Sequence, residues 1–199
     1  MKNHEKTKRM TGLALFTALV VVLQLLGSFI HLGQFSISLV LVPIVVGAAV
    51  YGVKGGLWLG LVFGFTVLIS GDAAFFMNYN LAGTIITVLL KGAMAGLMAG
   101  VMYKLIAGRT GRSDDRSGKS STIGTFAAAF TAPVVNTGIF ILGTLIFFIP
   151  LISQIAGDMN VYKYIFVGLI GGNFFFELGF NLLLCPVIER VINISAKAF

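Results

Sequence analysis

Apolar residues run through almost the whole of this 199-residue chain in long stretches. A segment such as 13–26 is apolar at nearly every position and would be apolar on every side of a helix. A transmembrane helix needs about 20 mostly apolar residues, whereas a membrane β-strand alternates apolar and polar residues over about 10 positions. The pattern therefore predicts an all-α protein embedded in a membrane.

Turn residues divide these stretches into six expected helices. Their ranges are 11–30, 38–53, 55–70, 80–107, 122–149 and 162–192. The second and third helices are short, are joined by residues 51–56, and could instead form one re-entrant pair. Pro43 is expected to kink the second helix, because proline removes a helical hydrogen bond. We therefore predict a six-helix transmembrane bundle that forms a single membrane domain over residues 11–192.

The composition agrees with this fold. Hydrophobic residues make up 57% of the chain and charged residues 11%, which is far from the averages of soluble domains. After six helices and their links, no length remains for a soluble catalytic domain. The single cysteine, Cys185, excludes an internal disulfide and a Cys-rich metal site.

The positive charges predict how the bundle is oriented. Lys and Arg gather in the tail at 1–10, at Lys54, in the link at about 108–121 and around the tail at 193–199, whereas the opposite side carries Lys163. Cytoplasmic segments of membrane proteins are enriched in Lys and Arg. Six crossings place both termini on one side, so we expect the N-terminus, the C-terminus and the link to be cytoplasmic.

No catalytic motif is visible. The link contains Gly118 and Lys119 followed by two serines, but a phosphate-binding loop needs a glycine five residues before this Gly-Lys pair, where Ser113 stands. Hydrolase and metalloprotease motifs are absent from the sequence as well. We predict that the chain is not an enzyme, binds no cofactor or metal and hydrolyses no ATP itself.

Two charges, Lys91 and Glu177, fall near the middle of predicted spans. Lys91 follows the outer end of its helix by about 11 residues, or about 16 Å. An isolated charge at that depth costs at least a few kcal/mol. Two alternatives follow: Lys91 pairs with Glu177, or it binds an anionic ligand.

Amide side chains add to this polar group. Asn173, Glu177 and Asn181 are spaced by four residues, so they share one face of the last helix, and Asn136 lies in the fifth helix. Buried amides need hydrogen-bond partners, so we expect a small polar cavity facing Lys91. The outer link at 71–80, rich in aromatics and amides, is a candidate lid over it, together with His31 and Gln34.

Small residues recur at four-residue spacing. The glycines are Gly52, Gly56, Gly60 and Gly64, and Gly92, Gly96 and Gly100. Such ridges allow close packing of helices in lipid, and we expect them to pack within the bundle. Ala14 and Ala18 make a smooth strip on the first helix, along which a helix of another protein can lie.

These features together resemble the S components of energy-coupling factor (ECF) transporters, the substrate-binding subunits of bacterial vitamin importers. The likeness rests on the six helices, the basic cytoplasmic ends, the Ala14 and Ala18 strip, and the run at 41–48 that leads into 51–60. It covers essentially the whole chain.

The resemblance implies a high-affinity vitamin receptor in the bacterial cell membrane. Ala14 and Ala18 would contact the coupling helices of a transmembrane subunit that sits on two ATPases, and toppling of the receptor would carry the vitamin inward. Family pockets lie near the outer side. The predicted substrate-binding residues are Gln34, Asn78, Tyr79, Asn80, Thr84, Lys91, Asn136, Asn173, Glu177 and Asn181.

The nature of the vitamin follows from the same residues. Lys91 among amides suits a small hydrophilic acid such as pantothenate. Riboflavin or folate would need aromatic stacking, which Trp58, Phe75, Phe76 and Tyr79 could supply. We favour the acid.

Two other classes of function remain open. In a self-sufficient channel or secondary transporter, Lys91 and Glu177 would couple ions, although the chain is small and shows no inverted repeats. A small membrane enzyme or an assembly scaffold is the second alternative.

Overall fold

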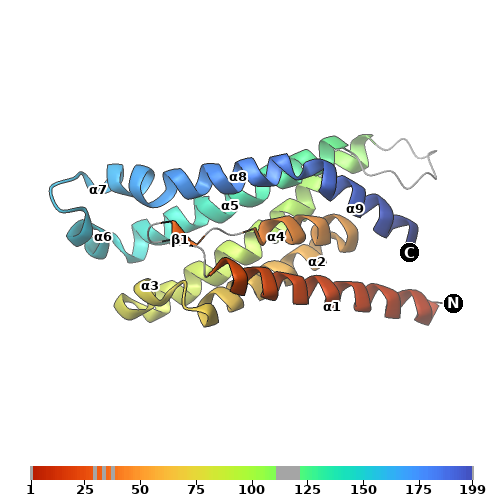
Figure 1. Cartoon of the computed structure of the whole chain (residues 1–199), viewed down its shortest axis with the longest axis horizontal. Coiled ribbons are helices and arrows are strands. Elements are labelled where there is room, and N and C mark those ends of the chain that lie inside the picture. The colour runs from red at the N-terminus through yellow and green to blue at the C-terminus, as the bar shows by residue number, and fades with distance from the viewer. Residues whose placement is uncertain (1, 29–30, 33–34, 37–38, 111–121, 199) are drawn as a thin grey trace.

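In the computed structural model the chain forms a bundle of long helices (Figure 1), described for residues 2–28, 31–32, 35–36, 39–110 and 122–198. In chain order its elements are α1 (Lys2–Gly27), β1 (His31–Leu32), β2 (Phe35–Ser36), α2 (Leu41–Ser70), α3 (Ala74–Tyr79), α4 (Leu81–Thr110), α5 (Thr122–Phe147), α6 (Ile149–Ala156), α7 (Val161–Lys163), the π-helix η1 (Tyr164–Gly171), α8 (Gly172–Leu183) and α9 (Cys185–Ala198).

Both chain ends lie at one end of the bundle, and α3, α6 and α7 lie at the other (Figure 1). The expected helical fold is confirmed, with one small addition: β1 and β2 pair as an antiparallel hairpin in the first outer link. Of the expected tails, the N-terminal one continues α1 as helix from Lys2.

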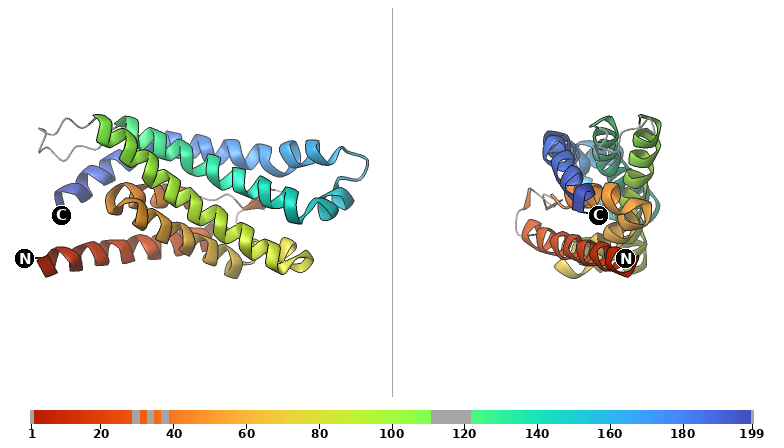
Figure 2. Two further views of the ribbon diagram at one scale, coloured as in Figure 1. Left: turned by 180° about the vertical axis from the view of Figure 1, so that it is seen from behind. Right: turned by 90° about the vertical axis from the view of Figure 1, so that its right-hand side faces the viewer.

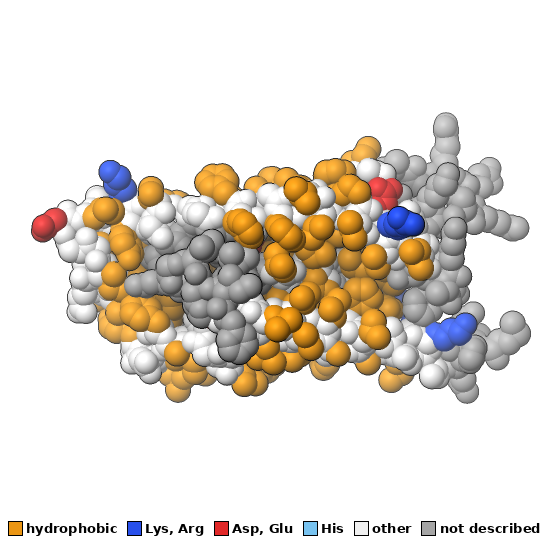
Figure 3. All heavy atoms as spheres, in the orientation of Figure 1, with side chains coloured by type: hydrophobic (Ala, Val, Ile, Leu, Met, Phe, Trp, Pro, Cys, Tyr) orange, Lys and Arg blue, Asp and Glu red, His pale blue; other side chains and the backbone are white. Residues whose placement is uncertain are grey.

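Four helices in the described part of the chain are long and apolar enough to cross a membrane, namely residues 6–27, 41–70, 81–107 and 122–147. A shorter apolar helix covers 174–183. On the face in Figure 3, apolar side chains cover the middle of the molecule and the coloured charged side chains lie towards its two ends. The count of six spans and the cytoplasmic position of the termini stay predictions.

The α2 element is a hairpin of two helical arms, because the backbone leaves the helical conformation at Gly52 (φ 79°, ψ −174°). This region of conformational space is accessible essentially to glycine alone. A Cβ added at Gly56 would lie 2.7 Å from the Cβ of Ala48, whereas residues eight apart in a straight helix are separated by about 12 Å. The chain therefore reverses at Gly52, between the second and third expected helices.

The predicted kink at Pro43 is wrong. Pro43 is the third residue of α2. Backbone N–H groups in the first helical turn have no intrahelical partner, so proline removes no hydrogen bond there. The break falls instead at Gly52, inside the glycine-rich link.

The second arm of α2 packs directly on α4 through the two glycine ridges. A Cβ added at Gly96 would lie 2.7 Å from the carbonyl carbon of Gly56, and one added at Gly60 would lie 2.8 Å from that of Gly92. Seen from behind, α4 crosses the molecule between α2 and α5 (Figure 2). The ridges thus pack inside the bundle, as their spacing indicated.

The last expected helix, at 162–192, is divided in the structure. It begins as α7, widens into η1, and breaks at Leu184 before α9. Pro186 is the second residue of α9, where proline suits the start of a new helix. Because α8 is regular, Glu177 and Asn181 keep their common face, and both are buried.

We expect Gly96→Ala to lower the free energy of unfolding by about 1–3 kcal/mol, because overpacked helices must move apart. Gly138→Ala is the control, since its new Cβ would meet nothing within 4 Å. Thermal unfolding of both purified variants in one detergent provides the measurement. Equal midpoints for the two variants would contradict the tight contact of α2 with α4.

Candidate functional site

Lys91 lies between two aromatic rings. Its Nζ atom is 5.8 Å from the ring centre of Phe63 on α2 and 5.4 Å from that of Phe140 on α5. Both distances allow cation–π attraction, which strengthens where water is excluded. The ammonium is thus held at the junction of α2, α4 and α5.

Two carboxylates interact electrostatically with this ammonium. Lys91 interacts electrostatically with Glu177 on α8 and with Asp72, which follows the C-terminal end of α2. The two alternatives for Lys91 named only Glu177 as a protein partner. The structure adds Asp72, so the charged group comprises one cation and two acids from three parts of the fold.

Asp72 connects this group to α1. The amide nitrogen of Gln24 donates a short hydrogen bond to Asp72 Oδ2, and Gln24 is buried. A charged acceptor makes such a bond stronger than one between neutral groups. Gln24 therefore ties the outer half of α1 to the end of α2.

Further polar side chains are buried along α4 and α5: Thr84, Thr87, Asn136 and Thr144. Thr84 and Thr144 donate their hydroxyls to the carbonyls of Asn80 and Phe140 in their own helices, each at 2.8 Å. Of the predicted site residues, Thr84, Lys91 and Asn136 are thus brought into the region where α4 meets α5.

The other predicted site residues are distributed more widely. Asn78 and Tyr79 are exposed on α3. Asn80 immediately precedes α4, and its side-chain oxygen accepts a hydrogen bond of 2.9 Å from Gly83 N. Gln34 lies outside the described residues, and of Asn173 the structure describes only the backbone, within α8.

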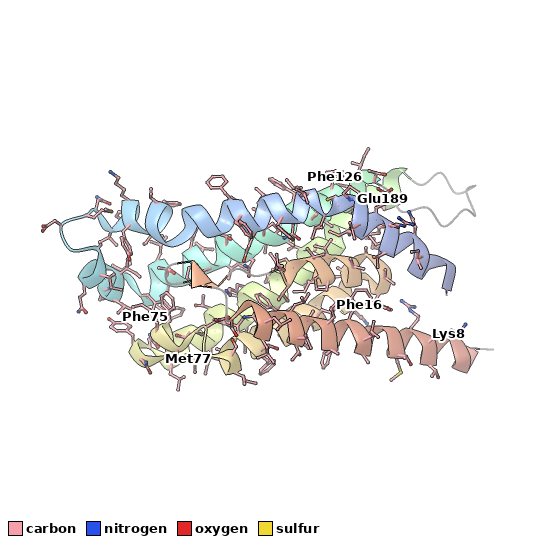
Figure 4. All side chains as sticks on the ribbon, viewed as in Figure 1. Lys8, Phe16, Phe75, Met77, Phe126 and Glu189 are labelled. Carbon is pink, nitrogen blue, oxygen red and sulfur yellow. The ribbon has the colours of Figure 1, made fainter. Side chains whose placement is uncertain are left out.

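Aromatic side chains form a cluster at the end of the bundle that lies opposite both termini. Phe76 of α3 packs edge-to-face on Phe140, with ring centres 5.7 Å apart, and on Phe148, 5.0 Å away. Ile152 of α6 and Ile165 of η1 complete this cluster. Figure 4 shows the neighbouring residues Phe75 and Met77 at the end of the bundle that is opposite Lys8 and Glu189. The expected lid thus corresponds to α3 packed on α5 and α6.

Five residues of this region were not among the predicted site residues: Gln24, Phe63, Asp72, Thr87 and Phe140. Thr87 precedes Lys91 by four residues and so shares its helical face, a signal that was available. Gln24 is a solitary amide in an apolar run, and this isolation was a second available signal. The aromatic neighbours come from distant segments, and nothing in their local sequence marks them.

The predicted partner strip is accessible. Ala14 and Ala18 are both exposed on α1, while Phe16 and Val20 are buried. The Trp58 indole donates a hydrogen bond of 3.1 Å to Thr17 Oγ1, and Phe16 packs edge-to-face on Tyr51. One side of α1 thus faces α2 and leaves the alanines outside.

The chain matches the family of the ECF transporter, substrate-specific component, over residues 8–189. It belongs to this family, as its sequence features indicated. A search of curated proteins gives no match. The chain is therefore a multi-pass membrane subunit of a transporter and not an enzyme. It works with the ECF coupling and ATPase modules on a small-molecule substrate.

We expect Gln24→Leu to lower the free energy of unfolding by about 1–3 kcal/mol, because a buried carboxylate loses a donor. Thr17→Val is the control. It removes the exposed bond to Trp58, which is worth about 1 kcal/mol or less. Thermal unfolding in detergent compares the two variants. A smaller effect for Gln24→Leu than for Thr17→Val would contradict the proposed tie between α1 and α2.

Proposed function

We propose that this S component is a high-affinity receptor for a water-soluble vitamin in the bacterial cell membrane. Its substrate is a small hydrophilic acid such as pantothenate, which binds beside Lys91. With both termini in the cytoplasm, the receptor docks on the ECF coupling subunit and topples to deliver the vitamin, while two partner ATPases hydrolyse ATP.

The main support is the position of Lys91. A lysine buried in a membrane bundle is costly, and such residues usually serve function. The rings of Phe63 and Phe140 attract its charge through their faces, and this leaves the N–H groups able to form charge-assisted hydrogen bonds with a carboxylate. We propose that these N–H groups bind the acid group of the substrate, in competition with Glu177 and Asp72.

The aromatic residues favour an acid over a flat ring system. Trp58 is directed towards α1, where it bonds to Thr17. The ring of Phe76 is buried and packed edge-to-face against three other rings, those of Phe75, Phe140 and Phe148, so it offers no open face for stacking. Tyr79 and Phe75 are exposed on α3. Phe75, Phe76 and Tyr79 pack edge-to-face or tilted on neighbouring rings, and Trp58 lies apart against α1, so the four residues do not form a parallel stacking site for riboflavin or folate.

Entry from outside is consistent with the cover over the site. The aromatic cluster of α3, α6 and η1 lies at the end of the bundle opposite both termini (Figure 1). α3 has only six residues and can shift more easily than the long helices. We infer that its movement opens the site to the outside.

Lys91→Met tests the role of the ammonium, because methionine fills similar space without the charge. We expect the affinity for pantothenate, measured by calorimetry on the purified chain, to fall roughly 10- to 100-fold, as for the loss of a hydrogen bond to a charged group. Lys104→Met, on the exposed end of the same helix, is expected to bind like the wild type.

Unchanged affinity in Lys91→Met, with a change in thermal stability alone, would make Lys91 a structural residue. If pantothenate fails to bind the wild type, the same titration with riboflavin, folate, biotin and thiamine tests the wider proposal. Binding of none of these vitamins would overturn the assignment as a vitamin receptor.

The partner surface gives a separate prediction. We expect Ala14→Leu with Ala18→Leu to reduce recovery of the complex with the coupling subunit and ATPases roughly tenfold, as for a central interface substitution. Leu19→Phe enlarges a side chain on another exposed part of α1 and serves as control. Pull-down with a tagged coupling subunit provides the measurement.

In this experiment the double variant must still bind its vitamin, which shows that the receptor is folded. Equal recovery of both variants with the coupling subunit would contradict the proposed role of the alanine strip.

A further inference from the structure

Four buried oxygens on uncharged side chains in the described part of the chain have no hydrogen-bond donor. They are Gln24 Oε1, Thr87 Oγ1, Asn136 Oδ1 and Asn181 Oδ1. Their residues are only 2%, 4%, 5% and 1% exposed. Buried polar atoms are normally hydrogen-bonded, and each exception calls for a reason such as a ligand.

The chemistry of the neighbours fixes two of these atoms as acceptors. Asn181 uses its nitrogen to donate a bond of 2.9 Å to the backbone carbonyl of Glu177. Gln24 likewise donates through its nitrogen to Asp72. Since a carbonyl or carboxylate accepts only from the NH₂ group, the remaining amide atom in each residue is the oxygen. These oxygens require donors.

Thr87 differs from six other threonines of the bundle. Thr11, Thr17, Thr66, Thr84, Thr131 and Thr144 all donate to the carbonyl four residues earlier, which is the usual outlet for a hydroxyl in a helix. Thr87 forms no such bond. Its side chain lies against Gly143, where an added Cβ would be 2.9 Å from Thr87 Cβ.

Thr87 and Asn136 flank Lys91 along the contact of α4 with α5. The two helices run antiparallel, since Gly83 lies against Phe147 and Thr87 against Gly143. Lys91 contacts Phe140. Asn136 lies one helical turn before Phe140 in α5. Seven residues of helix separate Asn136 from Gly143, about 10 Å. A single solute that bonds to both oxygens would have to extend over about this length, past Lys91.

We propose that the substrate is an acid that also carries hydroxyl or amide N–H groups, and that Thr87 Oγ1 and Asn136 Oδ1 accept hydrogen bonds from these groups. This inference rests on the proposed function and narrows it. Pantothenate, with two hydroxyls and an amide N–H, fits the description. Nicotinate and lipoate do not fit it, because they carry no hydroxyl or amide N–H donor besides the acid group.

The oxygens without a donor also predict a distinctive combination of effects on stability and affinity. Removing a buried oxygen that lacks a donor relieves a desolvation penalty, so the ligand-free protein gains stability. The same change removes an acceptor from the substrate. Thr87→Val should therefore raise the thermal midpoint or leave it unchanged, while affinity falls. A threonine that serves only packing would show no loss of affinity.

The experiment titrates the purified full-length chain with pantothenate, nicotinate, lipoate and N-butanoyl-β-alanine, an analogue of pantothenate without hydroxyls. We expect wild type to prefer pantothenate over the other three. Thr87→Val and Asn136→Leu should each weaken pantothenate roughly tenfold, the effect of one unpaired buried partner. They should change N-butanoyl-β-alanine binding less.

Thr66→Val is the matched control, because Thr66 is also buried but donates to Val62 O at 2.8 Å. It should keep the affinity for pantothenate and lower the thermal midpoint. Wild-type affinity of both Thr87→Val and Asn136→Leu, or equal binding of nicotinate and pantothenate, would overturn the inference and leave the receptor function standing. Failure of every vitamin to bind the wild type would overturn both.

Discussion

The direct contact between the backbones of α2 and α4 is the constraint on which the rest of the bundle depends. Lipid offers no hydrophobic drive for helices to associate, so close approach and dispersion must supply the stability. Gly56 and Gly60 meet Gly96 and Gly92 without side chains between them. This contact fixes α4 beside the second arm of α2, and it thereby brings Phe63 to Lys91.

Near the contact of α2 with α4, the bundle contains polar groups that a purely structural helix pair would lack. Lys91 shares its surroundings with two acids, and Gln24 connects one of these acids to α1. Each such group lowers the stability of the empty protein unless it is paired. Proteins commonly retain this kind of local cost where they bind a ligand, and here the groups gather beneath the aromatic cover formed by Phe76 and Phe148.

The sequence predicted the helices and the packing ridges well, because both depend on local patterns. Long apolar runs define spans, and glycines four residues apart lie on one helical face. It also pointed to Lys91, since a charge within an apolar run is conspicuous. The turn at Gly52 lies in the expected link at 51–56, whereas the kink expected at Pro43 is absent, because proline disturbs only a helix that it interrupts. Pro43 stands in a first turn and interrupts nothing.

Most of the residues around Lys91 could not be identified from the local sequence. Gln24 and Asp72 are 48 positions apart, and their contact exists only because α1 lies along α2. Phe140 is one phenylalanine among 18, and its role follows from the antiparallel register of α4 and α5. Thr87 shares a helical face with Lys91 in the sequence, but only the structure shows that its hydroxyl does not donate to its own helix. Such assignments need three-dimensional placement.

The single tryptophan of the chain has a useful position. Trp58 is half-exposed on α2 and donates a hydrogen bond to Thr17 of α1, the residue that precedes Ala18. Indole emission depends on the polarity around the ring. The natural fluorescence of the protein is therefore an intrinsic, label-free optical reporter of the environment of α1, the helix that carries the exposed Ala14 and Ala18.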